Sequence, residues 1–275
     1  MLLSWLLGNT ISAYLFVRAL THPGCAPVAP LPYEHVDIWL DVEGASIPAI
    51  YYPSQNGAAI IALGGLRSAQ GNQLPPVAFL LDAGYGVVQV GSRACAKPAR
   101  PVTLGAREIK EGEAALRYLQ TQSNMDSTQI GLFGFSMGGV GAIRLAAQQP
   151  SIAAVVAEGG YYNLGNDFTE PRTWDGIFRE VFLASAAGMY WMQTGVNPWM
   201  VSPIDDIEII APRPVLLIYG EHEAKSGRAQ MQFAAANEPK TLWIVPDGTH
   251  GTNHAIAPIE YEARVLAFFA DALKP

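Results

Sequence analysis

The chain is poor in charge and in cysteine, and both shortages exclude classes of function. Only 15% of its 275 residues are Asp, Glu, Lys or Arg, and the formal net charge is −7. A negative chain without a basic run is a poor partner for phosphate backbones, so no nucleic acid is expected to bind. The two cysteines, Cys25 and Cys95, are too few for a disulfide framework or a zinc site. A single bridge between them is one alternative, but two free thiols are expected.

Metal and cofactor signatures are also absent from the sequence. No group of Cys, His or carboxylate residues has the spacing of metal ligands, so no metal is expected. The glycine-rich stretches lack the features of a phosphate loop or a dinucleotide fold, so no cofactor is expected. Half of the residues are apolar, and the length suits one large α/β domain with a small insertion.

Residues 134–138, Gly-Phe-Ser-Met-Gly, fit the nucleophile-elbow pattern G-x-S-x-G. An apolar run at 129–133 precedes them and a run of small residues at 139–147 follows, which predicts strand, sharp turn and helix. Such a turn strains the serine backbone, and its glycines let strand and helix pass closely. Ser136 is therefore the candidate nucleophile, and the Met137 amide at the helix start is a candidate oxyanion donor.

A serine hydroxyl needs a neighbouring base to become nucleophilic. Among five histidines, His250 follows the apolar run 242–246 in a loop flanked by glycines, where it can reach over a sheet edge. His254, four residues later, is the alternative.

The imidazole in turn needs a carboxylate to orient it and to stabilise its charged form. Glu223 lies three residues after Gly220, which ends a predicted buried strand, and it is the candidate acid. The competing carboxylates are Glu221, Asp247 and Glu158.

Strands and helices alternate along the rest of the chain, which predicts a mostly parallel sheet covered on both faces. Catalytic loops then gather at the carboxyl ends of the strands. The expected strands are 34–42, 47–52, 59–63, 85–90, 129–133, 152–157, 214–219 and 241–245. The expected helices are 73–83, 103–122, 139–147, 226–236 and 258–273, with Thr103 capping the second.

The N-terminus departs from this alternation. Residues 1–17 hold no charged side chain, which predicts a hydrophobic helix over 1–20 and favours a membrane anchor. A helix packed on the domain, a dimer contact and a signal sequence are the alternatives. The single charge Arg18 favours a cytoplasmic catalytic domain. Residues 21–33 are proline-rich and predict a stiff linker to a domain over 34–275.

Residues 160–205 separate two predicted strands and are rich in aromatic side chains. They predict a small helical cap over the site, with an apolar pocket for an acyl or alcohol group. Ordinary packing of a long insertion is the alternative. The candidate pocket residues are Leu66, Tyr161, Trp174 and Phe178.

Three motifs make the chain resemble the α/β-hydrolase superfamily, in particular a bacterial esterase- or peptidase-like branch with an N-terminal hydrophobic helix. They are GFSMGG at 134–139, IAPRPVLLIYGE at 210–221 and VPDGTH at 245–250. The resemblance covers about residues 34–273 and implies an α/β-hydrolase fold with the order Ser136, Glu223, His250. It also implies that an amide after the strand 59–63 completes the oxyanion hole, and Gly65 is the candidate.

Three features depart from the family pattern. Leu63 replaces the usual histidine before the oxyanion glycines, and Glu223 stands where Asp is usual. The segment 91–96, GSRACA, replaces a loop that normally shapes the pocket wall.

The expected activity is hydrolysis of a small carboxylic ester with an apolar acyl group, through an acyl-enzyme and without a cofactor. Thioesters, lysophospholipids and peptides are alternative substrates of the same residues. An acyltransferase and a non-catalytic binding protein are the alternatives from other classes.

Overall fold

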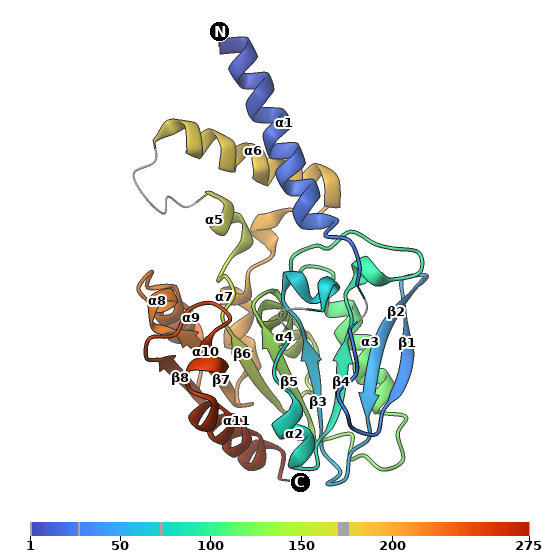
Figure 1. Cartoon of the computed structure of the whole chain (residues 1–275). Helices are drawn as coiled ribbons and strands as arrows, with labels where there is room; N and C mark the ends of the chain where they lie inside the picture. The colour runs from blue at the N-terminus through green and yellow to red at the C-terminus, as the bar shows by residue number, and fades with distance from the viewer. Residues whose placement is uncertain (1, 27, 72–73, 170–175, 275) are drawn as a thin grey trace.

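The computed structural model describes residues 2–26, 28–71, 74–169 and 176–274. Eight strands form one sheet in the order β1-β2-β4-β3-β5-β6-β7-β8 (Figure 1). β1 and β2 pair antiparallel, β2 pairs antiparallel with β4, and the remaining neighbours are parallel. The strands are β1 Val36–Val42, β2 Ala45–Tyr52, β3 Ala59–Leu63, β4 Gly86–Val90, β5 Ile130–Phe135, β6 Ala154–Glu158, β7 Val215–Gly220 and β8 Lys240–Val245. The α/β-hydrolase fold expected from the sequence is confirmed.

Helices cover both faces of this sheet. α3 (Ile109–Leu119), α4 (Met137–Gln148) and α9 (Arg228–Ala235) pack with one buried cluster, and α2 (Ala78–Asp82) and α11 (Pro258–Leu273) with the other. In β3, Ile61 belongs to the first cluster and Ile60 to the second. Both faces of the central strands are buried, which is why they read as continuous apolar runs.

Short helices and 3-10 turns connect these elements. They are α7 Pro203–Asp206, α8 Glu221–Ala224 and α10 Asn253–Ile256, with 3-10 turns η1 Leu66–Gln70, η2 Arg93–Cys95, η3 Pro198–Met200 and η4 Ile207–Ile210. Of these, η1, η2 and α8 follow β3, β4 and β7, whereas η3, α7 and η4 precede β7 and α10 lies between β8 and α11.

Two predicted helices are shorter than expected. α3 begins at Ile109, because Leu104 and Gly105 have φ angles of 51° and 94°, which no helix accommodates. Thr103 therefore does not cap the helix, although its hydroxyl oxygen accepts a hydrogen bond from the Arg107 amide at 2.8 Å. Of the helix expected over 73–83, the described residues form only α2, Ala78–Asp82.

The insertion 160–205 forms α5 (Leu164–Thr169) and α6 (Ile177–Thr194), which rise beyond the carboxyl ends of the strands (Figure 1). The N-terminal helix α1 (Leu2–Thr21) crosses α6 and packs against it. Asn9 Nδ2 donates to Ser185 Oγ at 2.9 Å, and the rings of Phe16 and Phe182 are 5.6 Å apart.

Among the residues that the structure describes, none of the helices, α1 included, is long and apolar enough to cross a membrane. The spanning anchor that the sequence favoured is therefore not supported. The contacts of α1 with α6 match the alternative of a helix packed on the protein.

The proline-rich linker after α1 is fastened to the domain at several points. Cys25 and Cys95 form a disulfide across 70 residues, so the expectation of free thiols is wrong. The Leu31 amide donates to the Tyr52 hydroxyl at 2.9 Å. The spacing of the two cysteines in the sequence does not reveal that the linker passes next to η2, which follows β4 and carries Cys95.

Candidate active site

Ser136 occupies the sharp turn between β5 and α4, with φ 55° and ψ −118°. Its amide donates to the Glu158 carbonyl at the end of β6 at 2.7 Å, which holds the strained residue in place. A Cβ on Gly134 would lie 2.1 Å from the Gly138 carbonyl oxygen, and one on Gly138 would lie 2.0 Å from that of Leu63. Glycine at both positions therefore permits the close approach that the elbow requires.

The structure brings Ser136, His250 and Glu223 together from three segments that each follow a strand. His250 Nε2 lies 2.9 Å from Ser136 Oγ, and His250 Nδ1 lies 2.8 Å from Glu223 Oε1. The elbow follows β5, Glu223 lies in α8 directly after β7, and His250 follows β8, so the three lie at the carboxyl ends of strands within one parallel part of the sheet. The Phe135 ring, 5.0 Å from the imidazole centre, supports one side of His250. The arrangement can pass a proton from the hydroxyl to the imidazole.

The competing candidates have other partners. His254 Nε2 pairs with Glu262 at 2.8 Å. Glu221 accepts a hydrogen bond from the Asp247 amide at 3.1 Å and lies 3.9 Å from the Lys225 ammonium group.

The hydrogen bond that His250 donates to Glu223 raises the pKa of His250 above its ordinary value, while partial burial opposes that shift. The net direction is upward because the carboxylate stabilises the imidazolium more than desolvation penalises it. A base that becomes charged during the reaction benefits from such a neighbour.

A network of buried hydrogen bonds around Glu158 supports the loop that carries His250. In the sequence, Glu158 was only a minor competitor for the role of the triad acid. Its side chain is 3% exposed. Its two oxygens accept from Asn253 Nδ2 at 2.9 Å and from the Tyr261 hydroxyl at 2.5 Å. Burial is the main cause that raises the pKa of Glu158. No local sequence pattern indicates this network, because Asn253 and Glu158 lie 95 positions apart in the chain.

The two predicted oxyanion donors lie at adjacent strand ends. Met137 is the first residue of α4, and Gly65 precedes η1, directly beyond β3, which pairs with β5. Neither amide donates a hydrogen bond to another described residue. An amide without a partner is what the predicted role as an oxyanion donor requires.

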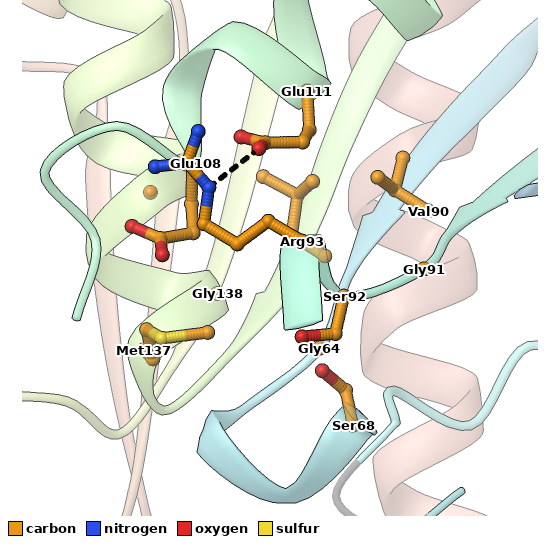
Figure 2. Close-up of a pocket in the computed structure, with 12 residues that line it drawn as sticks. Gly64, Ser68, Val90, Gly91, Ser92, Arg93, Glu108, Glu111, Met137 and Gly138 are labelled. Carbon is orange, nitrogen blue, oxygen red and sulfur yellow. Dashed lines mark hydrogen bonds and ion pairs between the residues drawn. The ribbon is translucent and has the colours of Figure 1, made fainter. Parts of the chain in front are cut away.

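A cavity of about 30 Å³, the size of one water molecule, lies behind Met137 (Figure 2). The Arg93 and Glu111 side chains meet beside it, with Arg93 Nε 2.9 Å from Glu111 Oε1. Burial raises the pKa of Glu111 to about 8. Arg93 comes from the segment 91–96 that departs from the family pattern, so this segment forms part of the wall of the cavity that Met137 also lines.

The structure describes the side chains of only two of the four predicted pocket residues, Leu66 and Tyr161. Leu66 begins η1, next to Gly65. The Tyr161 hydroxyl donates to the Leu104 carbonyl, and burial raises its pKa, so this group is used within the protein. Trp174 lies outside the described residues, as does the side chain of Phe178.

Among the described residues, no group of three His, Cys, Asp or Glu side chains could hold a metal ion.

Comparison with known proteins gives a family match over the catalytic part of the chain. The model of the "Prolyl oligopeptidase family" matches residues 99–275. The "Uncharacterized protein YfhR" of Escherichia coli strain K12 is 23% identical over 85% of this chain and 79% of its own length. The "Uncharacterized protein Rv2307c" of Mycobacterium tuberculosis is 26% identical over the same shares.

Solved structures share the fold. The Pyrococcus furiosus esterase Pf2001 aligns with TM-score 0.69 at 21% identity, over 91% of this chain and 98% of that one. A Mycobacterium tuberculosis puromycin-hydrolyzing peptidase aligns with TM-score 0.65 at 19% identity, over 89% of this chain but 40% of that one. At these identities the likeness extends to the fold alone.

Proposed function

We propose that this chain, which belongs to the prolyl oligopeptidase family and is an α/β-fold serine hydrolase, cleaves small carboxylic esters with Ser136, His250 and Glu223. The observation that carries the proposal is the chain of two hydrogen bonds, 2.9 and 2.8 Å, from the serine oxygen through the imidazole to the carboxylate.

In the proposed mechanism, His250 accepts the Ser136 proton as the hydroxyl oxygen attacks the ester carbonyl carbon. The amides of Met137 and Gly65 bind the resulting oxyanion, and each such donor contributes roughly 3 kcal/mol in the transition state. His250 then gives its proton to the leaving alcohol, and an acyl group remains on Ser136. A water molecule, deprotonated by His250, attacks the acyl-enzyme and releases the acid. The Glu223 carboxylate accepts the hydrogen bond from His250 Nδ1 and stabilises the imidazolium throughout.

Esters are the favoured substrates because the esterase from Pyrococcus furiosus matches over nearly its whole length. The peptidase neighbour has more than half of its chain outside the match. Peptides are the second candidate class, which the family description favours. The buried apolar cluster that joins α5, α6 and α1 supports an apolar acyl group.

Labelling with a fluorophosphonate probe tests the nucleophile. We expect wild type to react and Ser136→Ala to remain unlabelled, while both give the same circular dichroism spectrum. A panel of p-nitrophenyl esters from acetate to palmitate, beside aminoacyl and peptidyl p-nitroanilides, then compares the substrate classes. Faster turnover of anilides than of esters would replace the ester proposal by the peptidase one, and absence of labelling in folded wild type would overturn both.

A further inference from the structure

A second cavity, of about 310 Å³, lies between the α/β domain and the C-terminal end of α6. Polar side chains form most of its lining. Three of its lining residues are arginines, from the loop after β4 and the segment that leads into α3. The lining residues are Glu43, Arg93, Arg100, Pro101, Thr103, Arg107 and Thr194. Three guanidinium groups around one cavity, with one carboxylate, give it an excess of positive charge.

These guanidinium groups have N–H groups that no described residue binds and that can donate hydrogen bonds to a ligand. No described residue accepts a hydrogen bond from the Arg107 side chain, and Arg100 donates only one, a 3.3 Å bond from Nη2 to the Glu43 carbonyl. Arg93 is 4% exposed, and its Nη2 lies 3.7 Å from Glu43 Oε2, beyond hydrogen-bond length. Each arginine can therefore donate to an oxyanion without losing a strong partner.

Arg93 is the fixed part of this cluster. Its Nε is bonded to Glu111 at 2.9 Å and its Nη1 reaches Thr103 Oγ1 at 3.4 Å, so its orientation is set by the protein. A buried guanidinium held on one edge presents its other edge at low entropic cost. Arg100 and Arg107 are exposed and supply the adjustable side of the site.

We propose that this cavity binds the phosphate group of a small phosphorylated molecule. Phosphate offers several oxygens to the planar forks of arginine, and charge-assisted bonds of this kind are among the strongest in proteins. The cavity exceeds the volume of phosphate alone, so it also accommodates a small polar alcohol moiety beside Thr103 and Thr194. Arg93 lines the small cavity behind Met137 as well, which places the site one side chain from the candidate oxyanion hole.

Isothermal titration of the full chain at low ionic strength tests this assignment, with inorganic phosphate, glycerol 3-phosphate and glycerol as probes. Both phosphates should bind, glycerol should not, and glycerol 3-phosphate should bind more tightly. Arg107→Gln and Arg100→Gln should each weaken binding by about tenfold or more, because each removes charge-assisted donors. Glu43→Gln should strengthen it, because the competing carboxylate is lost.

Arg264→Gln is the matched control, because Arg264 pairs with Glu260 on α11 and does not line the cavity. It should leave the affinity unchanged, and thermal unfolding should show that every variant is folded. Cosedimentation with phosphatidylcholine vesicles, with and without phosphatidic acid, distinguishes a lipid headgroup from a soluble ligand. No binding of any phosphate probe to folded wild type up to about 10 mM overturns the proposal. Binding that the Arg100 and Arg107 substitutions leave unchanged also overturns it.

Discussion

Replacing Glu223 by alanine should remove most of the activity, while the same change at Glu221 should not. Glu223 holds His250 through the 2.8 Å bond to Nδ1, and this bond is the largest cause of the raised His250 pKa. Loss of the acid in comparable triads lowers turnover by about 10³- to 10⁴-fold, which corresponds to about 4 to 5.5 kcal/mol in the transition state.

Glu221 is a close control, because it lies in the same short helix and is two residues away. Its side chain is 46% exposed, and its partners are the Asp247 amide and the Lys225 ammonium group. An exposed pair contributes about 1 kcal/mol or less, so Glu221→Ala should change turnover by no more than about fivefold.

The measurement is kcat and KM for a p-nitrophenyl ester, with active sites counted by fluorophosphonate titration and folding checked by thermal unfolding. The predicted loss is in kcat, because the carboxylate acts on the charged imidazole of the transition state. Equal losses in the two variants, or a larger loss at Glu221, would refute the assignment of the acid.

Three further outcomes are expected. Activity should rise with pH as His250 becomes neutral, with a midpoint in kcat/KM above its ordinary 6.5, because Glu223 raises its pKa; a midpoint below that value would contradict the structure. Reducing the Cys25–Cys95 bond should lower the free energy of unfolding by about 4 kcal/mol, measured by urea titration with and without reductant, and Cys95→Ser should make reductant ineffective. Gly138→Ala should abolish labelling of the serine or prevent folding, since its Cβ would meet the Leu63 carbonyl oxygen at 2.0 Å, whereas Gly8→Ala, with open space around it, should do neither.

The sequence predicted the parts of the fold and site that depend on short-range patterns. β3 and α11 have the predicted bounds, because an apolar run and an amphipathic pattern fix them locally. Ser136, His250 and Glu223 could be named because each follows a recognisable apolar strand, and parallel strands bring their carboxyl ends to one edge of the sheet.

The remaining features depend on contacts between distant segments. The Glu158 network joins β6 to α10 and α11, and no local pattern announces a bond to a residue 95 positions away. The disulfide likewise depends on where the linker returns to the domain. The early start predicted for α3 was wrong because Leu104 adopts a positive φ, which propensity does not foresee.

The helices α1 and α6 pack together although more than 150 residues of chain lie between them. During synthesis the first helix emerges long before the helix that receives it, and at ribosomal rates the wait is about 10 to 35 s. For that interval the apolar side chains that it buries with α6 in the finished protein, Ala13 and Val17 among them, have no partner there. The order of translation thus leaves α1 without its partner helix for that interval, and a ribosome-profiling capture of nascent chains should show chaperone engagement that ends once α6 has emerged.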